Sequence, residues 1–179
     1  MPLAGIDLRI ADAETGTICA DGEIGIIELR GDNVFQGYWE MPDKTAESFR
    51  DDGFFITGDM AVRDADGYIS IVGRDKDMII SGGLNVYPRE VESLVDDVAG
   101  VIESAVIGVP HPDFGEAVVA IVAADDGAVS PNDITAAVDG KLAKFKQPKA
   151  VRIVPSLPRN SMGKVQKAAL RQTYAALFA

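Results

Sequence analysis

Residues 73–92 constrain the fold of this chain more than any other segment. A glycine is followed by charged residues and then by a short apolar run, a Gly-Gly pair at 82–83 and a proline at 88. The apolar run predicts a strand, paired glycines favour a tight turn, and proline is common in the first turn of a helix. Composition and spacing change on either side of this segment. We therefore expect two bodies to meet here.

The part before this segment is typical of short strands joined by tight turns. Alternating or apolar runs predict strands at residues 6–10, 25–30, 54–59 and 68–72. We interpret residues 1–75 as the end of a distorted β-barrel subdomain that belongs to a larger domain. Four residues are assigned to this fold and not to ligand binding: Glu23, Glu28, Tyr38 and Trp39. The two aromatic residues are expected to pack on the barrel.

After the segment, helices and strands alternate. Apolar residues at helical spacing predict a helix at 88–98, and Ser130 and Pro131 are suited to start a second helix that ends near 142. β-branched runs predict three strands, at 101–109, 117–124 and 151–154, before a closing helix at 167–178. Residues 76–179 are thus predicted to form a small α+β domain with a mostly three-stranded sheet flanked by helices.

Charge is distributed unevenly along the chain. The net charge of −11 argues against general nucleic-acid binding, yet residues 141–171 hold nine basic residues and no acidic one. This segment suggests a site for a polyanion such as the phosphates of a nucleotide or coenzyme, and a solvated basic face is the alternative. No signal peptide and no apolar run of roughly 18–20 residues is visible, and the single cysteine, Cys19, excludes an internal disulfide. We expect a cytoplasmic protein that binds neither nucleic acid nor membrane.

Three short motifs could carry chemistry. Asp59 ends an apolar run after Thr57-Gly58, where a carboxylate could accept hydrogen bonds from a sugar diol, although an ordinary turn aspartate gives the same pattern. Arg74 directly follows a strand glycine and could reach the same sugar or a phosphate. Gly163-Lys164 lies in the cationic segment. Pro158 and Val165 exclude the Walker-type phosphate loop, which leaves a loop lysine that could stabilise developing negative charge, or a plain turn lysine.

In this order and spacing the motifs form a specific set. It comprises Gly22-Glu23-Ile24-Gly25, Gly37-Tyr38-Trp39, Phe55-Ile56-Thr57-Gly58-Asp59, Gly73-Arg74-Asp75-Lys76-Asp77, Ser81-Gly82-Gly83, Glu90-Val91-Glu92, Val109-Pro110-His111-Pro112, Gly115-Glu116, Leu157-Pro158-Arg159 and Gly163-Lys164. The set resembles the C-terminal third of the adenylate-forming superfamily, which includes acyl-CoA synthetases, peptide-synthetase adenylation domains and luciferases. Within the superfamily, residues 49–59, 142–149 and 157–167 are most similar to malonyl-CoA synthetase.

The resemblance implies a role for each matching position. Asp59 would bind the ribose hydroxyls of ATP with help from Arg74, and Lys164 would be the catalytic lysine of adenylation. Lys76 would be the hinge of a mobile lid domain, residues 76–179. The CoA pantetheine tunnel would be lined by Gly82, Gly83 and Leu84.

The resemblance also implies the substrates and partners. A carboxylate, ATP and CoA would give acyl-CoA, AMP and pyrophosphate through an acyl-adenylate, with malonate as the expected acid. The family's triphosphate loop, acid pocket and Mg²⁺ carboxylate lie upstream of a Pro-Leu-x-Gly sequence, whereas this chain begins Met1-Pro2-Leu3-Ala4-Gly5. We therefore expect a fragment that has no complete ligase activity without an N-terminal domain, which would also supply the Mg²⁺ ligand.

Two other interpretations stay open. The chain could be a stand-alone module that binds CoA or a nucleotide, or that presents Lys164 to a lysine acetyltransferase. It could equally belong to a ligase for another acyl or aryl acid, because the residues that would read the acid lie outside this sequence.

Overall fold

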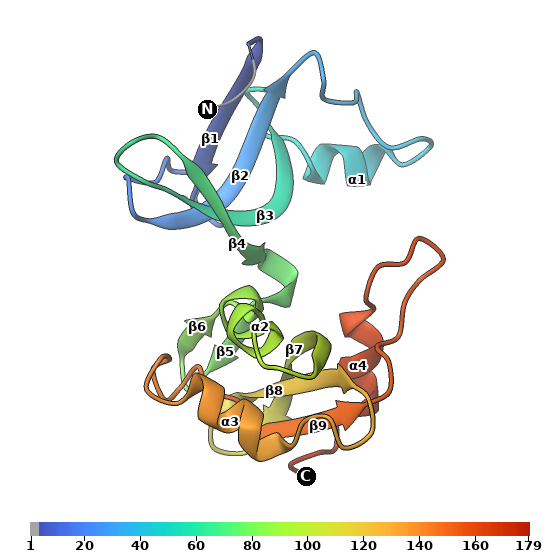
Figure 1. Ribbon diagram of the computed structural model, residues 1–179. Helices are drawn as coiled ribbons and strands as arrows, with labels where there is room; N and C mark the ends of the chain where they lie inside the picture. Colours follow the sequence, from blue (N-terminus) through green and yellow to red (C-terminus); the bar gives the residue numbers. More distant parts are fainter. Residues whose placement is uncertain (1–3) are drawn as a thin grey trace. The chain divides into compact units, whose positions relative to one another are not determined.

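The computed structural model describes residues 4–179 (Figure 1). The chain divides into two compact units, of which the first ends at Lys76 and the second runs from Asp77 to Ala179. The opening Met1-Pro2-Leu3, which helped to locate the chain within the family, lies outside the described residues. Each unit is described by itself below.

The first unit is built on an antiparallel sheet with the strand order β1-β2-β3-β4. Its strands are β1 (Ile6–Ala11), β2 (Ile24–Gly31), β3 (Phe55–Arg63) and β4 (Ile69–Arg74). The alternation in β1 turns Ile10 into a small core with Ile27 and Ala61. Helix α1 (Pro42–Glu47) lies in the connection between β2 and β3, and its proline occupies the first turn.

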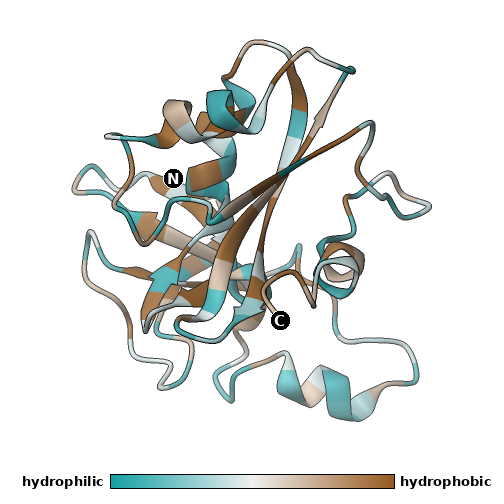
Figure 2. Cartoon of the chain, turned by 90° about the horizontal axis from the view of Figure 1, so that it is seen from below, coloured by the Kyte–Doolittle hydropathy of each residue, from teal (hydrophilic) through white to brown (hydrophobic). Residues whose placement is uncertain are grey.

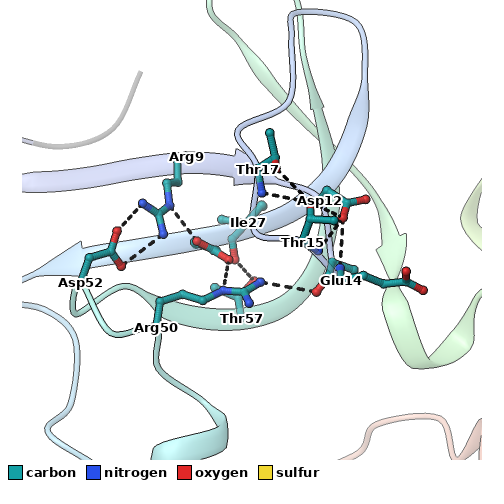
Figure 3. Close-up of polar contacts among 11 residues, drawn as sticks. Arg9, Asp12, Glu14, Thr15, Thr17, Ile27, Arg50, Asp52 and Thr57 are labelled. Atoms are coloured by element: carbon teal, nitrogen blue, oxygen red, sulfur yellow. Dashed lines mark hydrogen bonds and ion pairs between the residues drawn. The ribbon is translucent and has the colours of Figure 1, made fainter.

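Glu28 on β2 is fully buried and is ion-paired from two sides. Its carboxylate accepts hydrogen bonds from Arg9 Nε at 2.7 Å and from Arg50 Nε at 2.8 Å. Arg9 also donates to both oxygens of Asp52, at 2.6 and 3.2 Å, and these hydrogen bonds lower the pKa of the Asp52 carboxyl group (Figure 3). The network joins β1, β2 and the segment before β3, so Glu28 has the structural role that the sequence suggested.

The expectation that Trp39 packs on the barrel is wrong, because its side chain is 87% exposed. The aromatic contacts of this region instead join Phe35, Tyr38, Phe49 and Phe55 in edge-to-face or tilted pairs, with ring centroids 5.0–5.8 Å apart. Tyr38 takes part in this cluster but remains 37% exposed. Of the two neighbouring aromatic residues, Tyr38 contacts Phe35 and Trp39 is exposed, and spacing in the sequence did not show which of them would face solvent.

The second unit contains a five-stranded mixed sheet. Its strands are β5 (Ile79–Ser81), β6 (Leu84–Val86), β7 (Val101–His111), β8 (Gly115–Ala124) and β9 (Ala150–Val154). The three long strands are those that the sequence predicted. The two additional strands have only three residues each and form a hairpin that joins β8 through the Ser81–Gly115 pair. Because β7 pairs with β8 along its whole length, this hairpin and the parallel strand β9 share the other edge of β8.

Both faces of this sheet are covered, which confirms the predicted α+β class with flanking helices. On one face, α2 (Pro88–Asp96) and α3 (Pro131–Val138) pack over alternate β8 residues such as Val118 and Val122. On the other face, α4 (Lys167–Thr173) packs over the intervening ones, such as Ile121. The long apolar runs of β7 and β8 follow from this burial on both sides, and Figure 2 shows hydrophobic residues concentrated along the long strands.

The helices begin where predicted and end earlier. Ser130 caps α3, accepting from the Asp133 backbone N–H, while the Asp133 carboxylate accepts from Ser130 in a capping box. The helix ends at Val138 because Asp139 is extended, with φ −66° and ψ 136°, instead of continuing to 142. Helix α4 ends at Thr173, and turns follow as far as Phe178. Among residues 4–179, no helix is long and apolar enough to cross a membrane.

Candidate functional site

Asp59 and Arg74 lie opposite each other on neighbouring strands. The register of β3 and β4 pairs them directly, and Arg74 Nε donates to Asp59 Oδ1 at 2.8 Å. The Asp59 side chain is 30% exposed and that of Arg74 is 49% exposed. One carboxylate oxygen is therefore held by the arginine, while the side chain still reaches solvent where a ligand could approach. The structure thus brings together two residues that the sequence proposed for the same sugar.

A bulge in β3 shapes the backbone just before Asp59. The pairing with β2 shifts register between Ile26 and Glu28, so that β3 contributes extra residues at this point. Thr57 Oγ1 donates to the carbonyl oxygen of Ile27 at 2.9 Å and accepts from the Asp59 N–H at 3.0 Å. The Thr57 side chain therefore fixes the position of the Asp59 backbone. A strand that bulges in this way re-aims the next side chain, which suits a binding residue.

Lys76 is the last residue of the first unit. It lies in a single 3₁₀ turn, Asp75–Asp77, directly after β4, and its side chain is exposed. The next residue, Asp77, accepts a hydrogen bond from Arg171 of α4 at 2.7 Å and so belongs to the second unit. The backbone passes from one unit to the other at this turn, where the sequence placed a hinge.

Gly82 and Gly83 form the two-residue turn between β5 and β6. Their φ angles are +59° and +79°, and a positive φ at both central positions is the requirement of a type I′ hairpin. A β-carbon on Gly83 would meet no atom within 4 Å, so the glycine is needed for its backbone conformation and not because this unit crowds it. Leu84, the next residue, is 50% exposed. The turn thus presents an open, backbone-lined edge.

Two contacts attach this hairpin to β8. The Gly82 N–H donates to the carbonyl oxygen of Phe114 at 2.9 Å, and the Ile80 N–H donates to Glu116 Oε2 at 2.9 Å. Glu116 therefore uses its side chain to hold the edge of β5 that faces β8. Its motif, Gly-Glu at 115–116, was visible in the sequence, but its hydrogen-bond partner was not.

Lys164 lies on a tight turn between Pro158 and Gln166. An isolated β-bridge pairs Arg159 with Val165, and the Gln166 N–H donates to the Pro158 carbonyl oxygen at 2.8 Å. Asn160 Oδ1 accepts from the backbone N–H groups of Met162 and Lys164, at 3.0 and 2.9 Å. The Lys164 side chain itself is exposed. An ordered turn therefore carries an exposed ammonium group, as a lysine that must reach a ligand requires.

The cationic segment is partly neutralised by its own unit. Four of its nine basic residues form ion pairs with carboxylates upstream in the second unit: Lys146 with Glu90, Arg159 with Glu103, Lys167 with Glu92, and Arg171 with Asp77. Part of the charge asymmetry in the sequence is therefore internal pairing and not free surface potential. Lys164 is not among these paired residues.

The structure separates the proposed site residues into two groups. Asp59 and Arg74 are in contact in the first unit, and the Gly82–Leu84 turn and Lys164 lie in the second, with Lys76 at the boundary. Two residues that the sequence did not single out, Glu103 and Asn160, support the second group, as does Glu116, whose motif was noted without a role. The Asn-x-x-Gly pattern of residues 160–163 is a turn signal that could have identified Asn160. Glu103 lies 56 residues from its partner, and no local pattern indicates it.

No group of three or more His, Cys, Asp or Glu side chains in the described part of the chain is arranged to hold a metal ion.

Comparison with known proteins places this geometry in a family. Residues 90–164 match the AMP-binding enzyme C-terminal domain. The chain is 44% identical over 163 residues to the long-chain-fatty-acid–CoA ligase FadD13 of Mycobacterium tuberculosis, covering 91% of this chain and 32% of that protein. It is 43% identical to a feruloyl-CoA synthase of Amycolatopsis sp over 94% of this chain and 34% of that protein.

A solved structure agrees over almost the whole chain. ATP-bound MatB from Rhodopseudomonas palustris is 55% identical and matches with a TM-score of 0.92, covering 99% of this chain and 35% of that one. The chain thus spans about a third of the length of the relatives it matches. The matched domain ends at Lys164, the residue on the ordered turn. The chain belongs to the adenylate-forming superfamily and contains its AMP-binding enzyme C-terminal domain.

Proposed function

We propose that this chain serves an AMP-forming acid–thiol ligase, in which it acts together with an upstream adenylation domain of the kind its longer relatives have. The observation that carries the proposal is the ordered turn that presents Lys164 at the end of the matched C-terminal domain. Residues 1–75 would complete the large adenylation domain, and residues 76–179 would form the mobile lid. Because ATP and CoA would be the substrates, we place the enzyme in the cytoplasm.

In the first half-reaction, a carboxylate oxygen of the acid would attack the α-phosphorus of ATP, and pyrophosphate would leave with the electron pair of the broken P–O bond. Asp59 would accept hydrogen bonds from the ribose hydroxyls, with Arg74 holding its other oxygen. The Lys164 ammonium group would stabilise the negative charge that develops between the carboxylate and the phosphate. Mg²⁺, held by residues outside this chain, would neutralise part of the phosphate charge.

In the second half-reaction, the CoA thiolate would attack the acyl carbonyl carbon, and AMP would leave. The Gly82-Gly83 turn would line the path of the pantetheine arm, since it offers backbone without side chains at an exposed edge. Lys164 and this turn lie on the same unit, so a rotation about Lys76 would let them serve the site in alternation.

Malonate is the acid that we favour. Residues 49–59, 142–149 and 157–167 resemble malonyl-CoA synthetase, and the chain is 55% identical to MatB, compared with 44% and 43% for the long-chain and feruloyl ligases. The acid pocket would lie outside this chain, so an acid panel on the complete ligase is the direct test. Malonate should give the highest kcat/KM, and a clear preference for a long-chain or aryl acid would contradict the assignment.

The role of Lys164 has its own test. In the complete ligase, Lys164→Ala should lower acyl-AMP formation by at least about a hundredfold, the size expected when a charge-stabilising donor is removed. Attack of CoA on preformed acyl-AMP should be largely spared. Pyrophosphate–ATP exchange measures the first step, and thioester formation from synthetic acyl-AMP measures the second. An equal loss in both would count against the role assigned to Lys164.

A second candidate function rests on the exposure of Lys164 on its turn. The chain would then act as a module that binds CoA or nucleotide, or as the substrate of a lysine acetyltransferase. Calorimetry of the 179-residue chain with CoA and with ATP distinguishes the candidates. Tight binding of either ligand without turnover in the complete protein would favour the module.

A further inference from the structure

The turn that carries Lys164 is fastened to the sheet by a single guanidinium group. Arg159 Nη2 donates to the Glu103 carboxylate on β7, and Arg159 Nη1 donates to the carbonyl oxygen of Gly163. One side chain therefore joins a strand of the core sheet to the peptide bond between Gly163 and Lys164. The planar fork of arginine makes two directed hydrogen bonds at once, which a lysine at this position could not do.

The downstream end of the same segment is held independently. Lys167, the first residue of α4, donates to Glu92 Oε1 at 2.6 Å, and the same oxygen accepts from the Val106 N–H of β7 at 2.8 Å. Glu92 is 7% exposed. The turn is thus anchored on both sides, and Glu103–Arg159 is the anchor nearest to the Lys164 backbone.

The exposure of the Glu103–Arg159 pair shows what kind of role it can have. The side chains are 28% and 46% exposed, and pairs as accessible as this contribute little to global stability because water screens them. The pair is nevertheless the link between β7 and Gly163. Its expected effect is therefore local, on the position of the turn.

We propose that Glu103 and Arg159 are positioning residues that hold the Lys164 turn in the geometry needed for adenylation. Arg159 acts on the turn directly, and Glu103 acts through Arg159. The inference rests on the proposed function, because it assigns the pair to the step that Lys164 would serve. It adds a residue from β7, outside the lysine motif, to the parts of the chain that determine the rate of that step.

The first experiment needs no activity. Backbone ¹⁵N relaxation of the 179-residue chain reports the order of the Gly163 and Lys164 amides. Glu103→Gln should loosen both amides, while the amides of β7 and α4 stay as ordered as in the parent. The control is Asp21→Asn, which removes one partner of a similarly exposed ion pair with Arg63 in the first unit and should leave the turn unchanged. Unchanged order at Gly163 and Lys164 in Glu103→Gln would overturn the proposal.

The second experiment uses the complete ligase and separates the half-reactions. Glu103→Gln should lower kcat of pyrophosphate–ATP exchange by about ten- to a hundredfold, the size expected for a misplacement of about 1 Å, and change thioester formation from acyl-AMP by less than about twofold. Arg159→Gln should have at least the same effect. The double variant Glu103→Gln/Arg159→Gln should be no worse than Arg159→Gln, because Glu103 acts only through Arg159.

The two experiments together leave no outcome undecided. A loosened turn without a selective loss of adenylation, or additive losses in the double variant, would overturn the positioning role. If the parent ligase shows no exchange with any acid, the proposed function fails, and the relaxation data still decide whether Glu103 orders the turn. Asp21→Asn should retain parental rates in both half-reactions.

Discussion

Glu28 shows how much one charge can matter in a small sheet. Its carboxylate is fully buried between Arg9 and Arg50, whose side chains are only 19% and 25% exposed. Glu28→Gln keeps the shape of the side chain but removes the carboxylate partner of the half-buried Arg50 and leaves Arg9 paired with Asp52 alone. Breaking a buried pair in this way costs about 3–5 kcal/mol. We expect the free energy of opening of the first unit to fall by an amount near the lower figure, as measured by hydrogen exchange of the amides in β1–β3.

A matched control is available in the same sheet. Asp7 pairs with Arg30 at 2.7 Å, but the two side chains are 61% and 49% exposed. Asp7→Asn should therefore change the same exchange rates by less than the equivalent of about 1 kcal/mol. If both variants had equal effects, burial would not be the reason for the importance of Glu28.

For single residues, the sequence indicates which side chains could carry chemistry better than it indicates which residues surround them in the folded chain. Asp59, Arg74 and Lys164 could be proposed as site residues from their motifs and order, and the contact between Asp59 and Arg74 follows from two strands that the sequence also predicted. The burial of Trp39 was predicted wrongly because a loop has no regular period that indicates which side chains face solvent. Glu103 gave no signal at all, since its significance depends on a partner brought close only by the folded chain.

Among the elements, the β5–β6 hairpin makes the most specific demand on its residues. Gly83 has φ +79° with open space around the missing side chain. Gly83→Ala should destabilise the hairpin by about 1 kcal/mol, because the β-carbon of alanine is strained in the left-handed backbone conformation. Asparagine tolerates this conformation better. Hydrogen exchange of the amides in residues 79–86 should therefore rise more in Gly83→Ala than in Gly83→Asn.

The same two variants separate backbone conformation from space for a ligand. If the glycine serves only the turn, Gly83→Asn should restore thioester formation in the complete ligase relative to Gly83→Ala. We expect no such restoration, because any side chain would narrow the proposed pantetheine path. Adenylation should be retained in both variants, and parental thioester formation in Gly83→Asn would contradict the tunnel assignment.

Helix α3 gives a pH-dependent prediction. The hydroxyl and backbone N–H of Ser130 donate to Asp133 and lower the pKa of its carboxyl group below the usual 3.8. A lowered folded-state pKa stabilises the fold above the unfolded pKa, and this stability is lost as the pH falls through the folded one. Asp133→Asn should therefore destabilise the chain in urea unfolding at pH 7 and have little effect near pH 2. Asp126→Asn, in the exposed turn before the helix, is the control and should not destabilise the chain at pH 7.

Helices and strands were predicted correctly where the sequence contains a long periodic pattern or a clear capping motif. The capping box of α3 and the apolar face of α2 are local signals, and both elements begin where they were expected. The three-residue strands β5 and β6 carry too few residues to show a period, so the sheet was expected to have three strands and has five. Their pairing with β8 depends on a single residue pair distant in sequence, Ser81 and Gly115.

At the scale of the whole chain, the relatives themselves show more than one shape. The ATP-bound and apo crystal structures of MatB, at 55% and 56% identity over 99% of this chain, match it with TM-scores of 0.92 and 0.74. The matched third of MatB therefore differs in shape between those two crystals. The sequence could place a joint near residue 76, because composition changes there, but no sequence pattern specifies an angle between two bodies.

Lys76 is the position at which that joint can be tested. Proline at 76 would fix its φ near −65° and disfavour the helical conformation of Asp75, so the 3₁₀ turn would lose its freedom to rearrange. Alanine would remove the charge and leave the backbone free. If the turn is a hinge, Lys76→Pro in the complete ligase should slow one half-reaction by at least about tenfold more than the other, a difference of about 1.4 kcal/mol in barrier, because one orientation becomes inaccessible. Lys76→Ala should leave the ratio of the two rates within about threefold of the parent, a difference of less than about 0.7 kcal/mol.

Pyrophosphate–ATP exchange and thioester formation from acyl-AMP measure the two rates on the same preparation. Equal effects of proline and alanine would assign the importance of Lys76 to its charge, and equal slowing of both half-reactions by proline would mean that residue 76 is not the pivot.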